Sequence, residues 1–299
     1  MRGPAPEPRH EYYVSQRVRM HYVVWGDPSP GSGDAKPPLL LIHGGQDHCR
    51  NWDFVAAYLA DAFTIYAPDL RGHGDSGWSI GGMYSLPEFV YDVSVLADNL
   101  PPPLTIMGHS LGGAIALQYA GTFPDVVSRV VAIEGWGPPM IEEQPAHMRM
   151  RHWVGHMHEM ERRKPKRYAS REEATKRMIE ANPHLTPEMA YHLTLNGTRM
   201  NEDGTFSWKF DNYVRIRSPY QFNLEDARDI WREVRAPTLL IKGAESWAPD
   251  PDKSGRASVI PDHRTVIIEK AGHWVHHDQL DSVMDVVLDF LAEGQPARA

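Results

Sequence analysis

Ser110 lies in the segment Gly108-His109-Ser110-Leu111-Gly112-Gly113, which has the pattern Gly-x-Ser-x-Gly. An apolar run at residues 104–107 precedes this segment, and a helical apolar pattern begins at Leu111. A sharp turn from a strand into a helix leaves no room for bulk beside the serine, and Gly108 and Gly112 meet that requirement. The serine hydroxyl is then directed outward. In this context the pattern predicts that Ser110 is the nucleophile of a hydrolase.

Short apolar runs of the kind found in buried strands surround this turn. A Tyr- and Val-rich segment at 12–25 predicts an antiparallel hairpin, and six further runs predict strands of a sheet covered on both faces. These runs are residues 39–42, 63–67, 104–107, 130–133, 238–241 and 265–268. Helical apolar spacing at 52–60, 88–99, 111–123 and 280–291 lies between or after them, which indicates an α/β protein with a doubly wound sheet.

One gap between predicted strands is much longer than the others. About a hundred residues separate the run ending near Ile133 from the one starting at Thr238, and helix-like patterns occur within them at 171–182 and 187–196. Because a structureless loop of that length is uncommon in a compact domain, we expect a helical lid at 135–232. The core domain is then formed by residues 1–134 and 233–299.

Three motifs together resemble the α/β-hydrolase superfamily, and the resemblance covers residues 12–291. The first is the turn at Ser110. The second is His43-Gly44-Gly45, directly after the predicted strand at 39–42, and the third is the segment from Asp69 to Ser76, after the predicted strand at 63–67. The resemblance implies a mostly parallel eight-stranded sheet flanked by helices, with the lid inserted after strand 6. It also implies an oxyanion hole formed by the amides of Gly45 and Leu111. The segment at Asp69 is interpreted as structural.

The superfamily orders its triad as serine, acid and histidine, which places the histidine after the last strand. His273, in Ala271-Gly272-His273-Trp274-Val275, fits that place. An imidazole there can accept the serine proton because its pKa lies near neutrality. His276 and His277 follow too late to match the motif.

The acid departs from the usual pattern. After the seventh strand, where most members carry an aspartate, this chain has Ser246 and Trp247 at the two commonest positions. Glu245 lies one residue early. Some haloalkane dehalogenases instead place the acid at the end of the sixth strand, and here that residue is Glu134. A carboxylate at the edge of a core needs a partner, which a cationic histidine supplies. Glu134 is therefore the preferred acid and Glu245 the alternative.

These residues predict hydrolysis of a carboxylic ester through an acyl-enzyme, without a cofactor. An aspartate nucleophile would be expected of a dehalogenase or an epoxide hydrolase with this fold. Two alternatives stay open: a carbon–carbon bond hydrolase acting on a vinylogous diketone, and a ligand receptor with little turnover. The lid is rich in Met and Trp, so Trp136 and Trp153 are predicted to contact a hydrophobic or aromatic group of a small-molecule substrate.

Composition limits the other classes of function. The net charge of -8 disfavours binding to nucleic acid or to an anionic membrane surface. A single cysteine, Cys49, excludes an internal disulfide, and the first ten residues lack the apolar core of a secretory signal. A cytoplasmic protein is expected.

No metal is predicted, because His152, His156 and His158 have no nearby carboxylate or cysteine pattern of a zinc site. The oligomeric state is not determined by the sequence.

Overall fold

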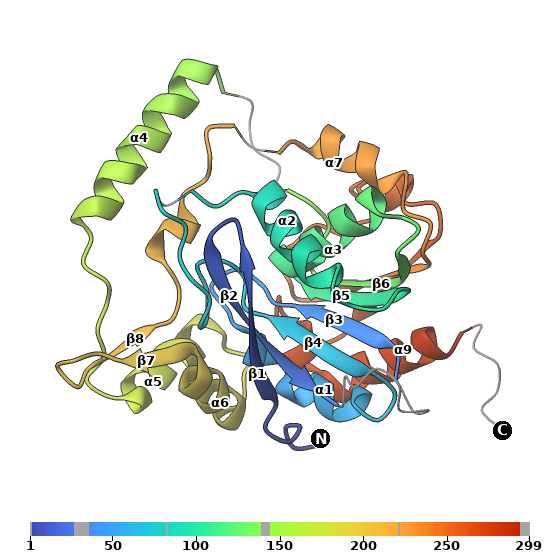
Figure 1. Ribbon diagram of the computed structural model, residues 1–299, viewed down its shortest axis with the longest axis horizontal. Coiled ribbons are helices and arrows are strands. Elements are labelled where there is room, and N and C mark those ends of the chain that lie inside the picture. The colour runs from blue at the N-terminus through green and yellow to red at the C-terminus, as the bar shows by residue number, and fades with distance from the viewer. Residues whose placement is uncertain (1, 27–35, 82, 139–143, 221, 294–299) are drawn as a thin grey trace.

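The computed structural model describes residues 2–26, 36–81, 83–138, 144–220 and 222–293. Within these ranges an eight-stranded sheet crosses the middle of the molecule in the order β1-β2-β4-β3-β5-β6-β9-β10 (Figure 1). Its strands are β1 Arg9–Ser15, β2 Val18–Trp25, β3 Pro38–Ile42, β4 Thr64–Pro68, β5 Leu104–His109, β6 Val127–Ile133, β9 Thr238–Gly243 and β10 His263–Ile268.

The sheet is mostly parallel. β2 runs antiparallel to β1 and to β4, and every other neighbouring pair in it is parallel. The strand β3 shows why its sequence is continuously apolar: Leu39 and Leu41 pack into one hydrophobic core, and Leu40 and Ile42 pack into another on the opposite face. This arrangement confirms the predicted α/β-hydrolase fold.

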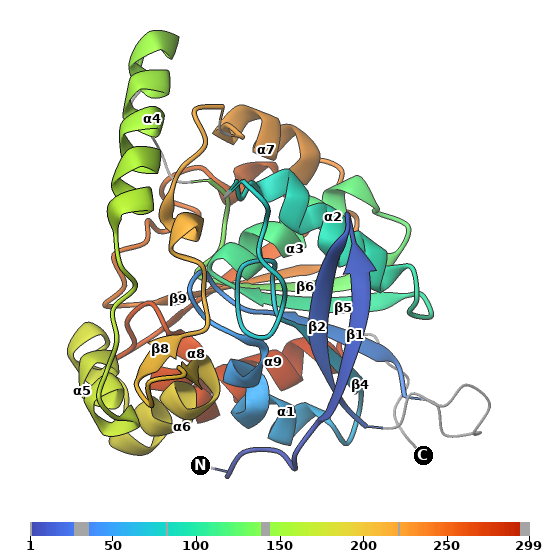
Figure 2. The same ribbon diagram turned by 60° about the vertical axis from the view of Figure 1, so that its left-hand side comes forward.

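Helices cover both faces of the sheet. In Figures 1 and 2, α2, α3 and α7 lie on one side, and α1 and α9 lie on the other. The helices are α1 Asp53–Leu59, α2 Leu86–Ala97, α3 Leu111–Thr122, α4 Ala146–Arg162, α5 Arg171–Ala181, α6 Pro187–Gly197, α7 Leu224–Trp231, α8 Val275–Asp278 and α9 Leu280–Ala292. Three short 3-10 helices are η1 Cys49–Trp52, η2 Asn212–Arg215 and η3 Ala257–Val259.

Side chains that cap helix N-termini fix where several helices begin. At α2, Ser85 and Glu88 form a capping box, in which the Glu88 carboxylate accepts the Ser85 backbone N–H at 3.0 Å. At α7, the Asn223 side chain accepts the N–H of Asp226 at 2.8 Å. These caps satisfy backbone donors that the first helical turn leaves unpaired, so the loops entering both helices are held in place.

The segment between β6 and β9 carries α4, α5, α6 and α7, together with a two-stranded sheet of β7 Thr198–Met200 and β8 Phe206–Trp208. The two helices predicted here are α5 and α6. The sequence did not predict β7 and β8, because strands of three residues leave little alternation to detect. Residues 139–143, which include Met140 of the predicted lid, lie outside the described residues.

The helices of this segment differ in their packing. None of the residues of α4 is buried, and both ribbon views show α4 projecting beyond the sheet domain. In contrast, α7 packs closely against α3, since a Cβ at Gly121 would lie 2.1 Å from the Ile230 carbonyl oxygen. The domain boundaries at 134 and 232 stay predictions, although α7, inside the predicted lid, rests on the core.

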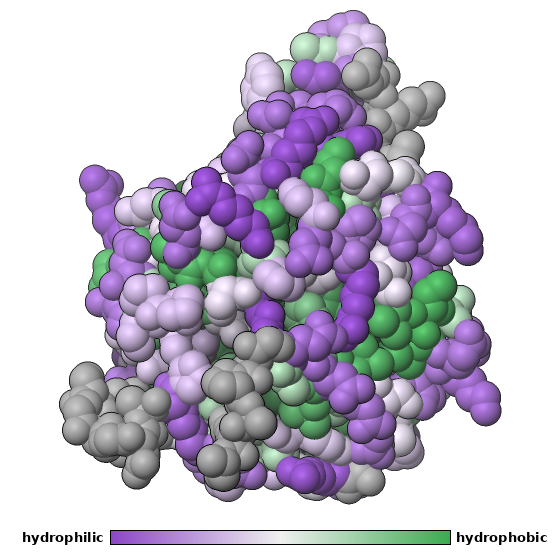
Figure 3. Space-filling view, turned by 90° about the vertical axis from the view of Figure 1, so that its right-hand side faces the viewer, coloured by the Kyte–Doolittle hydropathy of each residue, from purple (hydrophilic) through white to green (hydrophobic). Residues whose placement is uncertain are grey.

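On the face shown in Figure 3, hydrophobic residues form separate groups that are surrounded by hydrophilic ones. Scattered apolar groups of this kind are normal on a protein surface. Across the described ranges, no helix combines the length and the hydropathy that crossing a bilayer requires.

Buried histidines are a further feature of the core. His43, His73 and His277 are almost fully inaccessible to solvent. Burial lowers the pKa of His43 and of His277 to about 3 and that of His73 to about 4. An unfolded chain takes up protons on these imidazoles as the pH falls below about 6.5, whereas the folded chain does not. Stability that is present near neutral pH is therefore lost progressively toward pH 4.

We predict that each of these histidines lowers the free energy of unfolding by about 2 kcal/mol when the pH falls from 7 to 5. Urea unfolding at several pH values will measure this slope. His277→Phe, which cannot titrate, should flatten it, and His156→Gln on the exposed face of α4 should not. An unchanged slope in His277→Phe would contradict the prediction.

Candidate active site

Ser110 occupies a strained turn between β5 and α3. Its φ of 52° and ψ of -114° lie outside the regions favoured by non-glycine residues. The turn is feasible because its neighbours lack side chains: a Cβ at Gly108 would lie 2.1 Å from the Gly112 carbonyl oxygen, and a Cβ at Gly112 would lie 2.0 Å from that of Ile42. The strain places the Ser110 side chain at the edge of a cavity.

His273 follows β10 and faces Ser110. Its Nε2 lies 3.0 Å from Ser110 Oγ, which is hydrogen-bonding distance. The His109 side chain donates from Nε2 to the His273 carbonyl oxygen at 2.9 Å and so holds the backbone of this loop. The Trp247 ring stacks on the His273 imidazole with the ring centroids 4.8 Å apart, although Trp247 itself is 80% exposed.

Glu134 follows β6 and contacts the second ring nitrogen of His273, with 3.3 Å between Oε2 and Nδ1. Its φ of 53° is positive, as is that of Ser110, so both residues lie at turns that non-glycine residues seldom adopt. The carboxylate is buried and accepts two further hydrogen bonds: from the Gly243 N–H at 2.6 Å and from the Ser246 hydroxyl at 2.7 Å. Three donors therefore offset the cost of burying this charge.

The structure brings Ser110, His273 and Glu134 into one chain of contacts and leaves Glu245 outside it. The Glu245 side chain is 55% exposed and faces His184 at 3.5 Å. Sequence reasoning missed Ser246. That residue stands where the superfamily usually has its aspartate, and its hydroxyl bonds to Glu134 instead. The sequence did offer one signal for this role, because Ser246 is a polar residue at a position where most members carry the acid.

The predicted oxyanion residues, Gly45 and Leu111, both line the cavity that contains Ser110. Leu111 is the first residue of α3, where backbone N–H groups lack helical partners. The loop at Gly45 is fixed by His43, whose Nδ1 donates to the Gly44 carbonyl at 2.7 Å and whose Nε2 accepts the Leu70 N–H at 2.9 Å. A neutral imidazole suits this dual role, in keeping with its lowered pKa.

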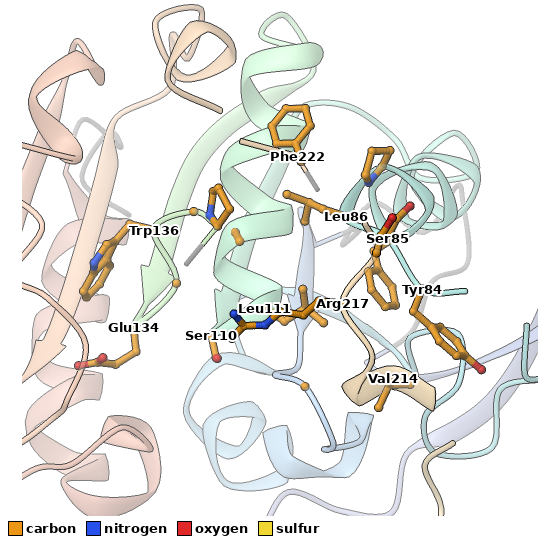
Figure 4. Close-up of a pocket in the computed structure, with 18 of the residues that line it drawn as sticks. Tyr84, Ser85, Leu86, Ser110, Leu111, Glu134, Trp136, Val214, Arg217 and Phe222 are labelled. Atoms are coloured by element: carbon orange, nitrogen blue, oxygen red, sulfur yellow. The ribbon is translucent and has the colours of Figure 1, made fainter. Parts of the chain in front are cut away.

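The cavity has a volume of about 850 Å³. Figure 4 shows Ser110 and Leu111 at its base, Glu134 and Trp136 on one side, and Tyr84, Ser85 and Leu86 on the other. Val214, Arg217 and Phe222 contribute from the segment between β6 and β9. Trp136 is thus part of the wall, whereas Trp153, on α4, is not among the residues that line it. A role for Trp153 stays a prediction.

Among the described residues, one cluster of potential metal ligands lies outside the lining of this cavity. His21, Cys49 and Asp69 are buried with their ligand atoms within 4.8 Å of one another. The Asp69 carboxylate already accepts hydrogen bonds from His21 Nδ1 and the Cys49 N–H, both at 2.7 Å. These bonds hold the loop after β4, in line with the structural interpretation of that motif. His152, His156 and His158 are exposed on α4.

Comparison with known proteins gives results consistent with this geometry. The sequence model of the alpha/beta hydrolase fold matches residues 37–280. "Serine hydrolase-like protein" of Danio rerio is 26% identical over 284 residues, 91% of this chain and 85% of that protein. "Esterase Rv0045c" of Mycobacterium tuberculosis is 28% identical over 262 residues, 85% of this chain and 83% of that protein. A solved "Thioesterase Domain From Curacin Biosynthetic Pathway" superimposes with a TM-score of 0.80 at 23% identity, covering 95% and 100% of the two chains.

The turns at Ser110 and Glu134 touch through Gly135, where a Cβ would lie 2.3 Å from the Ser110 carbonyl oxygen and 2.6 Å from the Gly113 Cα. We predict that Gly135→Ala lowers the unfolding free energy by about 2 kcal/mol or more, because backbone atoms must separate. Gly155→Ala on exposed α4, where a Cβ meets nothing within 4 Å, should be neutral or slightly stabilising. Urea unfolding compares the two, and equal effects would contradict the prediction.

Proposed function

Because the chain belongs to the alpha/beta hydrolase fold family, we propose that it is a serine hydrolase that cleaves a carboxylic ester through an acyl-enzyme. The observation that carries the proposal is the pair of contacts made by His273, at 3.0 Å to Ser110 Oγ and at 3.3 Å to Glu134 Oε2. The similarity to a protein named as an esterase supports a hydrolytic activity.

In the first half of the reaction, His273 accepts the Ser110 proton through Nε2, and the serine oxygen attacks the acyl carbon. The imidazole becomes a cation as this happens. The Glu134 carboxylate lies beside its other nitrogen and is held by the Gly243 N–H and the Ser246 hydroxyl, so it stabilises that cation and fixes the ring. Ser246 is a positioning residue for this carboxylate.

The negative charge that develops on the substrate oxygen requires donors that are already in place. The amides of Gly45 and Leu111 are proposed for this role, since both residues line the cavity beside Ser110. His273 then protonates the leaving alcohol. A water molecule, deprotonated by the same imidazole, attacks the acyl-enzyme and releases the acid.

The wall of the cavity favours a substrate with an apolar part. Leu86, Phe89, Trp136 and Phe222 line it, and Trp247 lies over His273 at its edge. Such a surface binds a hydrophobic or aromatic acyl or alcohol group by excluding water from it. The predicted domain division, with residues 135–232 as a lid, is part of this proposal because Val214 and Phe222 belong to that segment.

The nucleophile can be tested directly. A fluorophosphonate probe should label the intact protein at Ser110 with a stoichiometry near one, since the probe traps an activated serine. Ser110→Ala should not be labelled. Equal labelling of Ser110→Ala, or none of the wild-type protein, would overturn the proposal. Labelling without turnover of any ester would favour the ligand receptor instead.

The identity of the acid can be tested by a matched pair of amide substitutions. We expect Glu134→Gln to lower kcat on a phenyl ester at least about a hundredfold, because the imidazolium loses its counter-charge. Glu245→Gln should stay within about twofold of the wild-type rate, given its exposure and its distance from the imidazole. The reverse pattern would assign the acid to Glu245.

A further inference from the structure

The cavity at Ser110 holds an uneven set of charges. Of the described residues, two carboxylates and two guanidinium groups line it: Glu134, Asp226, Arg217 and Arg256. Glu134 is fully engaged by His273 and two other donors. Asp226 is exposed at the start of α7 and accepts a hydrogen bond from the Asn223 side-chain amide at 2.6 Å. Both carboxylates therefore accept hydrogen bonds, whereas neither arginine forms an ion pair with a carboxylate of the described residues.

Arg256 is a buried cation, 4% exposed. Its Nη1 donates to the carbonyl oxygens of Trp136 at 3.1 Å and Pro138 at 2.8 Å, and its Nε has no hydrogen-bond partner among the residues that the structure describes. No carboxylate of the described residues lies within ion-pair distance of it. Burial without a compensating charge also lowers its pKa. Because an unpaired buried charge is costly, a cation placed in the wall of an active cavity calls for a ligand that offsets the cost.

Arg217 is the second such cation, and it is exposed. It follows η2, and Figure 4 shows its guanidinium directed into the cavity on the side of Ser110. It makes no hydrogen bond or ion pair with any residue in the part of the chain that the structure describes. Its neighbour Arg215 differs, since that guanidinium lies over the Phe210 ring at 5.2 Å and is not part of the cavity wall.

The two guanidinium groups have no carboxylate partner among the described residues, whereas the Glu134 carboxylate in the same wall already accepts from three donors. The planar fork of a guanidinium matches a carboxylate, with two parallel hydrogen bonds. We propose that the protein acts on esters that also carry a carboxylate, which Arg217 binds beside the reacting group while Arg256 adds a second positive charge. The inference rests on the proposed function for the reacting bond, and it narrows the substrate class to anionic esters with an apolar portion.

Matched substrates test this selectivity. 4-Acetoxybenzoate and 4-acetoxybenzamide differ in a charge on the alcohol side, and monophenyl adipate and its primary amide differ in a charge on the acyl side. We expect kcat/KM for the carboxylate member to exceed that of the neutral member at least about tenfold in one pair, mainly through KM. Comparing this ratio between variants cancels the intrinsic reactivity of each ester.

The variants follow from the exposure of Arg217, which allows substitution without disturbing the core. Arg217→Gln should lower the ratio severalfold toward one, since only the charge of Arg256 is left, and Arg217→Glu should lower it further. Arg215→Gln, two residues away and outside the cavity wall, is the matched control and should keep the wild-type ratio. A ratio near one in the wild-type protein, or one that Arg217→Gln leaves unchanged, overturns the inference while the proposed hydrolase stands.

A binding measurement separates this inference from catalysis. In Ser110→Ala, calorimetry with 4-hydroxybenzoate, 4-hydroxybenzamide, adipate and adipamide reports recognition without turnover. At least one carboxylate should bind about tenfold or more tightly than its amide, and adding Arg217→Gln should reduce the difference severalfold. Absence of binding by both carboxylates, or equal binding of carboxylate and amide, overturns the inference. If carboxylates bind selectively but no ester is cleaved and the fluorophosphonate does not label Ser110, the proposed function fails instead.

Discussion

The active end of the sheet depends on the buried carboxylate of Glu134. A negative charge that is removed from water requires donors close to it, and this one has three, from different parts of the chain. The Gly243 N–H comes from the end of β9, the Ser246 hydroxyl from the loop that follows it, and the His273 imidazole from the loop after β10. Satisfying one charge therefore fixes the relative positions of three segments, and it leaves Nε2 of His273 facing Ser110.

The backbone at the ends of β5 and β6 supports the same arrangement. Ser110 and Glu134 both adopt a positive φ, so each side chain leaves its strand at a sharp turn toward the cavity. One hydrogen bond joins the end of β6 to the turn at Ser110, whose N–H donates to the Ile133 carbonyl at 2.8 Å. A second ties the turn at Glu134 to β9, because the Glu134 N–H donates to the Ile241 carbonyl at 2.9 Å. Gly135 then packs on the Ser110 carbonyl, where no larger residue fits. The strain at both side chains is thus held by the sheet.

Local signals were enough to predict most of the sheet. The apolar run of β3 and the Gly-rich turn at Ser110 reflect constraints that act within a few residues, and both appear as expected. The exposed helix α4 and the strands β7 and β8 lacked such signals: α4 buries no residue, and the strands are three residues long. The closeness of Ser246 to Glu134, and of Trp247 to His273, depends on packing between loops distant in sequence. For the same reason, the unpaired state of Arg217 and Arg256 could not be predicted, because it is defined by which carboxylates are not nearby.

The whole arrangement depends on the hydrogen bond between Nδ1 of His273 and the Glu134 carboxylate. Proton NMR of the intact protein tests it directly, because an imidazole N–H that is hydrogen-bonded to a buried carboxylate resonates far downfield of the amide N–H protons. The His273 signal is assigned by its absence from His273→Gln, which separates it from the signal of the His21–Asp69 pair. We predict that it disappears or moves strongly upfield in Glu134→Gln and is unchanged in Glu245→Gln. A signal that survives in Glu134→Gln and is lost in Glu245→Gln would contradict the assignment of Glu134 as the partner of His273.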